Sequence, residues 1–320
     1  MPIRLAIALI LAVSASAQLR PVHTYSIVVR DPATGELGVA VQSHWFSVGS
    51  LVPWAEAGVG AVATQSFVDP SYGKLGLELM RAGKSASEAL ASLLAGDGGR
   101  DVRQVAMVDA QGRVAAHTGA RCIDFAGHHT GKTYSVQANL MSNDKVWPAM
   151  SKAFETAHGD LADRLLAALD AAEAAGGDIR GRQSAALLIV SGRPTGKPWV
   201  DRVFDLRVDD SPRPLEELRR LVILQRAYNH MNAGDLAVER KENEAALREY
   251  GAAARLAPDN AEIVYWHAVA LVNMDRIAEA LPLFRRIYAV DSNWRVLTPR
   301  LVKSGLLPDN PEVIQRLVQP

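Results

Sequence analysis

Few residues in this sequence have the type and spacing that would indicate a disulfide or a metal site. Cys122 is the one cysteine, so the chain cannot form an internal disulfide. The adjacent His128 and His129 could suggest a metal site, but no second ligand pair stands at helical spacing, so a turn or surface position is the simpler interpretation. No cysteines or histidines have zinc-finger spacing. We therefore expect no metal or other cofactor, and stability that comes from packing.

The predicted secondary structure that must position the site changes near residue 215. Upstream, short β-rich runs alternate with two pairs of helices, and downstream the pattern is helical throughout. Ser85 and Glu88 have the spacing of a helix capping box, and Gly176-Gly177 ends the last helix of the first part. The predicted strands cover 24–30, 36–43, 58–65, 102–109, 113–118, 134–140, 184–190 and 202–208, and the predicted helices 72–81, 85–94, 144–157 and 160–175.

This order of elements predicts a layered architecture. Strands joined by hairpins form antiparallel sheets, and paired helices can each cover one outer face. The continuous apolar runs 58–63 and 185–190 are typical of strands buried on both faces. The sequence therefore predicts an α+β fold, with a four-layer αββα sandwich over residues 24–212 and an all-α domain over residues 213–320.

The N-terminus has the pattern of a secretory signal. Arg4 precedes nine apolar residues (5–13) and the small-residue stretch 14–17. Nine apolar residues are too few for a permanent anchor, which needs roughly 20. We expect a signal peptide over 1–17, cleaved near Ala17-Gln18, a short leader over 18–23, and a periplasmic or secreted protein with no stable membrane anchor. A retained N-terminal core segment is the alternative.

Charge argues against one class of partner. Lys plus Arg and Asp plus Glu number 35 each. A balanced chain has no basic field for a polyanion, so we expect no nucleic-acid partner.

Several stretches in the first part carry a resemblance to a known family. They are T-Y-S-I-V-V-R-D (24–31), G-E-L-G-V-A-V-Q-S (35–43), V-P-W-A (52–55), A-G-V-G-A-V-A-T-Q (57–65), A-A-H-T-G (115–119) and G-G-D-I-R-G-R-Q-S-A-A-L (176–187). In this order they resemble the family called domain of unknown function 1028, over about residues 24–211. That family is placed with the N-terminal nucleophile (Ntn) hydrolases, whose αββα sandwich matches the predicted order of elements.

The resemblance implies a chemistry for Thr24. Members of the superfamily use a Thr, Ser or Cys at the start of the first strand as nucleophile, with its own free α-amino group as base. A free amine with a pKa of about 7.7 to 8.0 can act as a base at neutral pH, whereas a peptide nitrogen cannot. The family usually begins Met-Thr, and the matching residue here is Thr24.

This sequence departs from the family pattern in two ways. After signal cleavage, the residues 18–23 still precede Thr24, so a second cut between His23 and Thr24 is required. Proteasome-type members also place a lysine early in the chain, whereas the first lysine here is Lys74. Arg30 or Arg182 could supply positive charge, but arginine does not give up its proton. A β-branched residue that merely starts a strand is the structural alternative for Thr24.

Polar residues at other strand ends could share the pocket with Thr24. Ser43 could face it across the first hairpin. At these strand ends, Asn139 and Gln183 could donate to a developing oxyanion, and Asp178 with Ser184 could hydrogen-bond the amine. Each also has a structural interpretation as a turn, cap or strand-end residue. His117 is consistent with a histidine in a sheet that hydrogen-bonds a local partner. His44 and Trp45 could bind a ligand by stacking, or the aromatic side chain could be buried at a sheet edge.

The second part repeats with a period of 34 residues. Ala246, Leu247, Tyr250 and Leu256 align with Ala280, Leu281, Phe284 and Val290, which is the tetratricopeptide period. The leading helix is predicted over 214–232, with a break at Gly234-Asp235. Two repeats are few for a stable solenoid, so we expect them to dock on the sandwich or on a second copy in a homodimer. A protein or peptide partner in their groove is the other expectation.

Two functions remain open from the sequence. In one, the protein is an exported amidohydrolase that cleaves a small-molecule or peptide amide through an acyl-Thr24 intermediate. In the other, the fold is catalytically silent and serves as a binding or scaffold module through its helical repeats.

Overall fold

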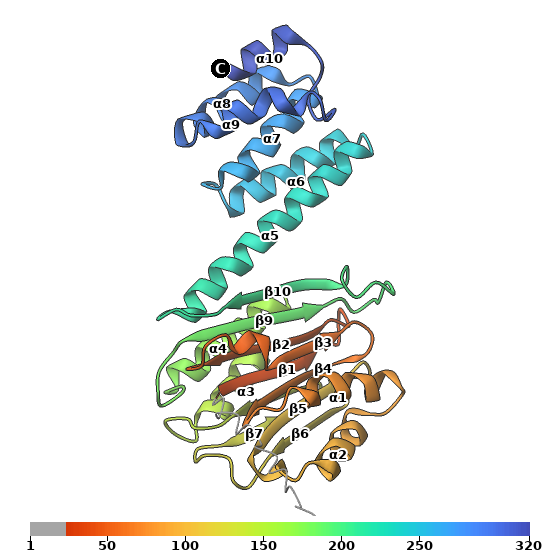
Figure 1. Cartoon of the computed structure of the whole chain (residues 1–320), viewed down its shortest axis with the longest axis vertical. Helices are drawn as coiled ribbons and strands as arrows, with labels where there is room; N and C mark the ends of the chain where they lie inside the picture. Colours follow the sequence, from red (N-terminus) through yellow and green to blue (C-terminus); the bar gives the residue numbers. More distant parts are fainter. Residues whose placement is uncertain (1–23) are drawn as a thin grey trace, which may run out of the picture. The chain divides into compact units, whose positions relative to one another are not determined.

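The computed structural model of the chain describes residues 24–320, so the predicted signal peptide and leader lie outside the described residues. Contacts between residues divide the chain into two compact units, with the boundary between Val203 and Phe204. The first unit contains sheets with helices, and the second is built around helices α5 to α10 (Figure 1). The predicted α+β class is confirmed.

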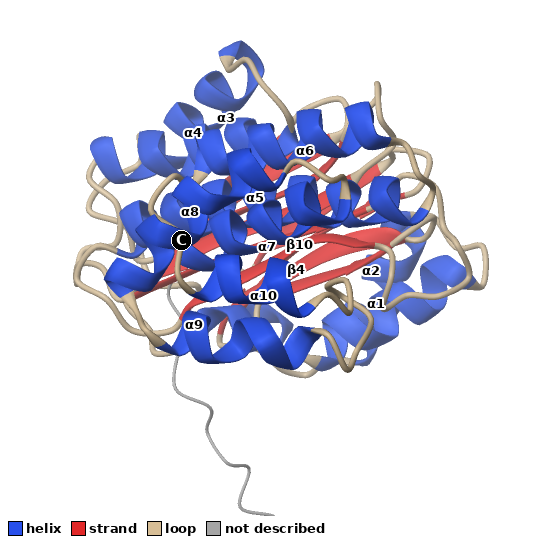
Figure 2. Cartoon of the chain, turned by 90° about the horizontal axis from the view of Figure 1, so that it is seen from above, coloured by secondary structure: helices blue, strands red, loops and turns tan. Residues whose placement is uncertain are grey.

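Two sheets form the centre of the first unit, and the edge strand β10 of one of them continues past the boundary at Val203 (strands red in Figure 2). One has the strand order β10-β9-β2-β1-β8-β7 and the other the order β3-β4-β5-β6. The pairings among β1 to β9 are antiparallel, as short hairpin connections require. The strands are β1 (Thr24–Arg30), β2 (Leu37–Ser43), β3 (Pro53–Glu56), β4 (Gly60–Ser66), β5 (Arg103–Asp109), β6 (Val114–Thr118), β7 (Gly127–Thr130), β8 (Tyr134–Ala138), β9 (Ser184–Val190) and β10 (Arg202–Val208).

Each sheet carries a pair of helices. Helices α1 (Ser71–Arg81) and α2 (Ala86–Gly96) contact the four-stranded sheet. Helices α3 (Val146–Thr156) and α4 (Leu161–Ala174) contact the six-stranded sheet (Figure 1). The capping box predicted for the second helix forms at Ser85, which accepts from the Glu88 N–H while the Glu88 carboxylate accepts from the Ser85 N–H.

The alternation of side chains along β1 sets which residues point between the sheets. Val28 belongs to a buried cluster that includes Ala61 and Ala106 of the other sheet. The Tyr25 hydroxyl instead reaches the Glu173 carboxylate on α4 at 2.8 Å. Because alternate residues of a strand point to opposite faces, Thr24 and Ser26 share the inner face with Val28.

Two short strands were missed by the sequence prediction. β3 begins with a proline, and β7 has the sequence Gly-His-His-Thr, so neither shows the apolar alternation that predicts a strand. Both are at an edge of their sheet, where pairing on one side suffices. His128 and His129 therefore lie on an exposed edge strand, which agrees with the predicted surface position and not with the turn.

The second unit is made of helical hairpins. α5 packs against α6 and α7 against α8, and the side-chain oxygens of Asn260 and Asn310 cap the N-termini of α7 and α10. No helix in residues 24–320 combines the length and apolarity needed to cross a bilayer. The helices are α5 (Pro214–Glu239), α6 (Asn243–Leu256), α7 (Ala261–Asn273), α8 (Ile277–Val290), α9 (Asn293–Leu297) and α10 (Pro311–Val318), with a 3-10 turn at Thr298–Leu301.

The predicted break at Gly234-Asp235 is wrong, because α5 continues to Glu239. A glycine costs a helix interior about 1 kcal/mol relative to alanine. Here the missing side chain allows close packing, since a Cβ on Gly234 would lie 3.1 Å from the ring of Tyr250. The contact between α5 and α6 thus outweighs the local preference.

Candidate functional site

Thr24 begins the central strand of the six-stranded sheet, between β2 and β8. Its side chain is fully buried, and its hydroxyl donates to Ser43 Oγ at 3.1 Å. Thr24 is directly opposite Ser43 in the sheet, and Ser43 is opposite Ser184 on β9. Three hydroxyl residues therefore stand in one row at this end of the sheet.

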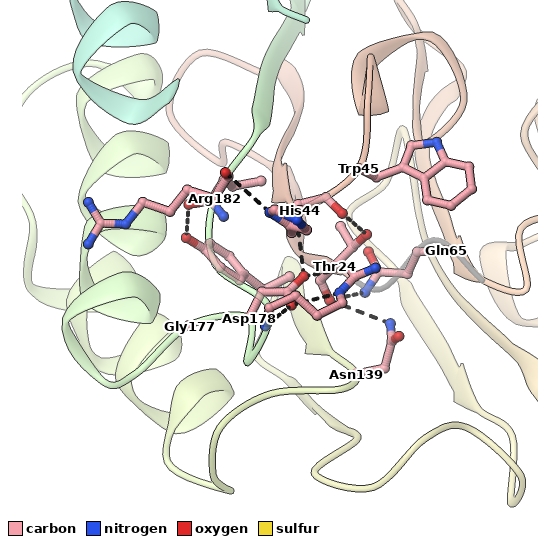
Figure 3. Close-up of polar contacts among 12 residues, drawn as sticks. Thr24, His44, Trp45, Gln65, Asn139, Gly177, Asp178 and Arg182 are labelled. Atoms are coloured by element: carbon pink, nitrogen blue, oxygen red, sulfur yellow. Dashed lines mark hydrogen bonds and ion pairs between the residues drawn. The ribbon is translucent and has the colours of Figure 1, made fainter. Parts of the chain in front are cut away.

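The backbone carbonyl of Thr24 is held by two amide side chains from different elements (Figure 3). Gln65 Nε2, at the end of β4, donates to this carbonyl at 3.1 Å. Asn139 donates its backbone N–H at 3.1 Å, with its Nδ2 at 3.5 Å. These contacts fix the backbone of Thr24 from both sheets.

Gln104, near the start of β5, connects these two amides. Its Oε1 accepts from Gln65 Nε2 at 2.7 Å and from Asn139 Nδ2 at 2.8 Å. Its Nε2 donates to the carbonyl of Ala138 at 2.9 Å and to Thr118 Oγ1 at 2.9 Å. A carbonyl oxygen can only accept, so the amide of Gln104 has one orientation. Such a satisfied buried network specifies a single arrangement of the strands around it.

More buried polar side chains adjoin this network along β1 and β8. Ser26 Oγ donates to Gln65 Oε1 and accepts from Gln137 Nε2, both at 2.6 Å. Ser135 Oγ donates to Gln137 Oε1 at 3.0 Å. Each of these side chains is fully buried. Polar residues thus replace apolar ones between the sheets at this end, next to the apolar cluster around Val28.

A cavity of about 550 Å³ opens at the same end of the sheets. Thr118, which contacts Gln104, lines it together with His128, Asp124, Phe125 and Trp147. Thr118 Oγ1 lies 2.8 Å from His128 Nδ1. Either of these two atoms can be the donor, depending on the tautomer of the imidazole. Desolvation, with the neighbouring histidines, lowers the pKa of His128, so this imidazole is neutral at neutral pH and can accept.

Cys122 lines this cavity as well. Burial raises the pKa of its thiol, and its Sγ donates to the carbonyl of Arg103 at 3.3 Å. A protonated, buried thiol is a poor nucleophile. No group of three His, Cys, Asp or Glu side chains in the described part of the chain is arranged to hold a metal ion.

Of the residues predicted from the sequence, the structure brings Thr24, Ser43 and Asn139 into direct contact. Ser184 Oγ donates to the carbonyl of Trp45 and accepts from the N–H of Val48 at 3.1 Å, so it anchors the loop that follows β2.

Asp178 and Gln183 serve the neighbouring loops. The buried Asp178 carboxylate accepts from the N–H of His44 at 3.2 Å and pairs with the Arg180 guanidinium at 2.7 Å (His44 and Asp178 in Figure 3). The half-buried Gln183 donates its backbone N–H to the carbonyl of Ser43 at 3.1 Å. His117 Nε2 lies 2.8 Å from the carbonyl of Arg100, a local backbone partner.

Sequence reasoning missed Gln65 and Gln104 as site residues. The available signal was the position of a glutamine at the end of an otherwise apolar strand, as in the run that ends Ala63-Thr64-Gln65. Gln104 stands directly opposite Gln65 in the antiparallel pairing of β4 and β5. Only that register brings the two amides together.

Comparisons with known proteins match the part of the chain that contains these residues. A family model described as "Family of unknown function (DUF1028)" matches residues 24–218. Among solved structures, the crystal structure of protein SPO2555 from Silicibacter pomeroyi, a protein of the same family model, is 32% identical, with a TM-score of 0.56. That match covers 62% of this chain and 84% of the other. No curated protein matches the chain.

Proposed function

This chain belongs to the DUF1028 family of unknown function, and from that premise we propose that it is an exported amidohydrolase of the Ntn type with Thr24 as its nucleophile. The proposal includes the αββα arrangement of that superfamily. Two facing sheets with a helical pair on each outer face support it. The second unit we assign to tetratricopeptide-like repeats, since Ala246 and Ala280, and likewise Tyr250 and Phe284, occupy matching buried positions.

The observation that carries the proposal is the setting of Thr24. It is the first residue of a central strand, its hydroxyl contacts Ser43, and its carbonyl is held by Gln65 and Asn139. A residue that only started a strand would need none of these buried amides. Burying them costs stability unless every polar atom is paired, so a cluster of this kind is typical of a site that must hold one geometry.

The proposed reaction begins with a cut between His23 and Thr24. The freed amine of Thr24, with a pKa of about 7.7 to 8.0, takes the proton of Thr24 Oγ1 as this oxygen attacks the carbonyl carbon of an amide. The C–N bond then breaks, and the leaving amine takes the proton from the α-amino group. Water attacks the acyl-Thr24 ester and releases the acid, which restores the free threonine.

The cavity beside Thr118 supports a limit on the substrate. Its volume of about 550 Å³ falls within the usual range for small-molecule sites, roughly 300 to 1,000 Å³. Aromatic side chains, Phe125 and Trp147, share its wall with Asp124 and His128. We propose that this cavity binds the part of a small-molecule or short-peptide substrate that lies on one side of its amide bond.

A chain that starts at Thr24 tests the chemistry apart from the processing. Expressed as Met followed by Thr24, it loses its Met and exposes the threonine amine. We expect this form to hydrolyse members of an amide library, Thr24→Ala to be inactive, and a matched chain whose mass shows residues 18–23 still attached to be inactive until the bond between His23 and Thr24 is cut. Equal turnover by all three chains would exclude the amine as base.

The alternative is a catalytically silent module that acts through its helices. The full burial of Thr24 favours it, because a nucleophile must reach solvent or substrate. If the exposed-threonine chain and its Thr24→Ala variant are equally inactive on every amide, this second function is preferred.

A further inference from the structure

The helical unit contains a second cavity, of about 350 Å³, formed entirely by residues of that unit. α5 contributes Asp235 and Glu239, α6 contributes Tyr250, and α7 contributes Trp266 and Val269. The charged residues of the lining are the two carboxylates, and no lysine or arginine is among them. Two aromatic rings and two acids are the elements that bind an organic cation in proteins.

The positions of Asp235 and Glu239 on α5 are electrostatically unfavourable for the isolated helix. Asp235 and Glu239 are four residues apart, so they lie on the same face of α5, and Glu239 is its last residue. Like charges at this spacing repel, and negative charge at a helix C-terminus opposes the helix dipole. The last turn of α5 has no basic residue, and the nearest basic residues along the chain are Arg240 at the C-cap and Lys241 after it.

The surroundings leave the negative charge available. The Tyr250 hydroxyl donates to one oxygen of Asp235, which fixes that carboxylate. Burial, together with this contact, raises the pKa of Tyr250. Glu239 forms no ion pair with any residue of the described chain. His267 stacks on Tyr250 with ring centroids 5.5 Å apart. Burial lowers the pKa of His267, so it adds no positive charge at neutral pH.

We propose that this acidic-aromatic pocket, defined by Asp235, Glu239, Tyr250 and Trp266, binds an arginine or lysine side chain presented by a partner polypeptide. The carboxylates neutralise the cationic head, and Trp266 and Val269 contact the aliphatic stem, as long basic side chains require. The volume accommodates one such side chain and excludes a folded domain. The negative charge of the pocket requires a positively charged side chain on the partner. The volume of the cavity limits the contact to one such side chain.

Blocked tripeptides test the proposal on the mature full-length chain. The probes are Ac-Gly-Arg-Gly-amide, Ac-Gly-Lys-Gly-amide, the Gln analogue and free agmatine. The readout is the indole N–H resonance of Trp266, assigned by its loss in Trp266→Phe. We expect saturable shifts with the Arg and Lys peptides and none with the Gln peptide, with binding that weakens as salt rises.

Matched charge variants separate the pocket from general electrostatics. Glu239→Gln should weaken Arg-peptide binding about fivefold, since one close charge contributes on the order of 1 kcal/mol. The control Glu216→Gln, at the start of the same helix and 65% exposed, makes the same change in net charge and should leave binding unchanged. Asp235→Asn keeps an acceptor for Tyr250 and should weaken binding by a similar factor.

Three results would overturn the proposal. One is the absence of any shift at Trp266 with millimolar cationic peptide. Another is equal binding of the Gln peptide, which would make the pocket a general apolar groove. The third is binding of agmatine without binding of either peptide, which would assign the pocket to a small amine. None of these outcomes depends on the chemistry proposed for Thr24.

Discussion

Replacing Gln104 by leucine should destabilise the sheet-containing unit by about 2 to 4 kcal/mol. The amide of Gln104 makes contacts of 2.7 to 2.9 Å with Gln65, Asn139, Thr118 and the carbonyl of Ala138. After the change, the first three keep other partners, but the carbonyls of Ala138 and of Gly127, which lies 3.2 Å from Nε2, lose their side-chain donor. Each buried polar group left without a partner costs about 1 to 3 kcal/mol, so two such groups at about 1 to 2 kcal/mol each give the range above.

Native-state hydrogen exchange is the suitable assay because the two units can open independently. A loss of about 2 to 4 kcal/mol corresponds to exchange about 30-fold to 1,000-fold faster for the most protected amides of β1, β4 and β5. Amides of α7 and α8 should not change. Gln111→Leu, on the exposed turn between β5 and β6, is the matched control and should shift exchange by less than about 0.5 kcal/mol. If Gln104→Leu behaves like this control, the buried network does not hold the strand ends and the reasoning fails.

Three further predictions concern stability. Leu165→Ala, at a fully buried position on α4, should cost about 2 to 5 kcal/mol by chemical denaturation, and a cost below about 1 kcal/mol would mean that α4 does not cover a packed core. Asp178→Asn removes the charge that holds the His44 N–H and the Arg180 guanidinium, so exchange at His44 should accelerate about 10-fold; unchanged exchange would show that this carboxylate does not fix the loop. The pKa of His267 is lowered from its ordinary value of 6.5 by burial, so the unfolded chain binds more protons and stability should fall as pH drops below 6.5. A His267→Gln chain should lose less stability over that pH range, and an equal loss in both chains would contradict the assignment.

The sequence predicted much of the framework because local patterns determine it. The bounds of the strands Thr24–Arg30, Ser184–Val190 and Arg202–Val208 were predicted as found, since apolar or alternating runs and flanking turns define them without tertiary information. The helix break at Gly234 was wrong because a contact with Tyr250, a residue on another helix, decides that position. Local propensity has no access to such a contact.

The site was harder to predict than the framework. Ser43 could be placed beside Thr24 because both belong to one hairpin whose register follows from its turn. Gln65 and Gln104 lie on neighbouring strands, β4 and β5, which are separated in the sequence by two helices. Which glutamine faces inward depends on the register of this pairing, and the sequence does not state that register. The same holds for the cavity at Thr118, whose walls come from β6, the loop after it, β7 and α3.

The mass of the mature N-terminus tests the central claim most directly. The protein and its Thr24→Ala variant would be recovered from the exporting host and their first residues determined by mass spectrometry. The account predicts that the wild-type chain starts at Thr24 and that the variant stops at Gln18, because the threonine hydroxyl drives the second cut. Two chains that both start at Gln18 would contradict the account, since Thr24 would then have no free amine to act as base.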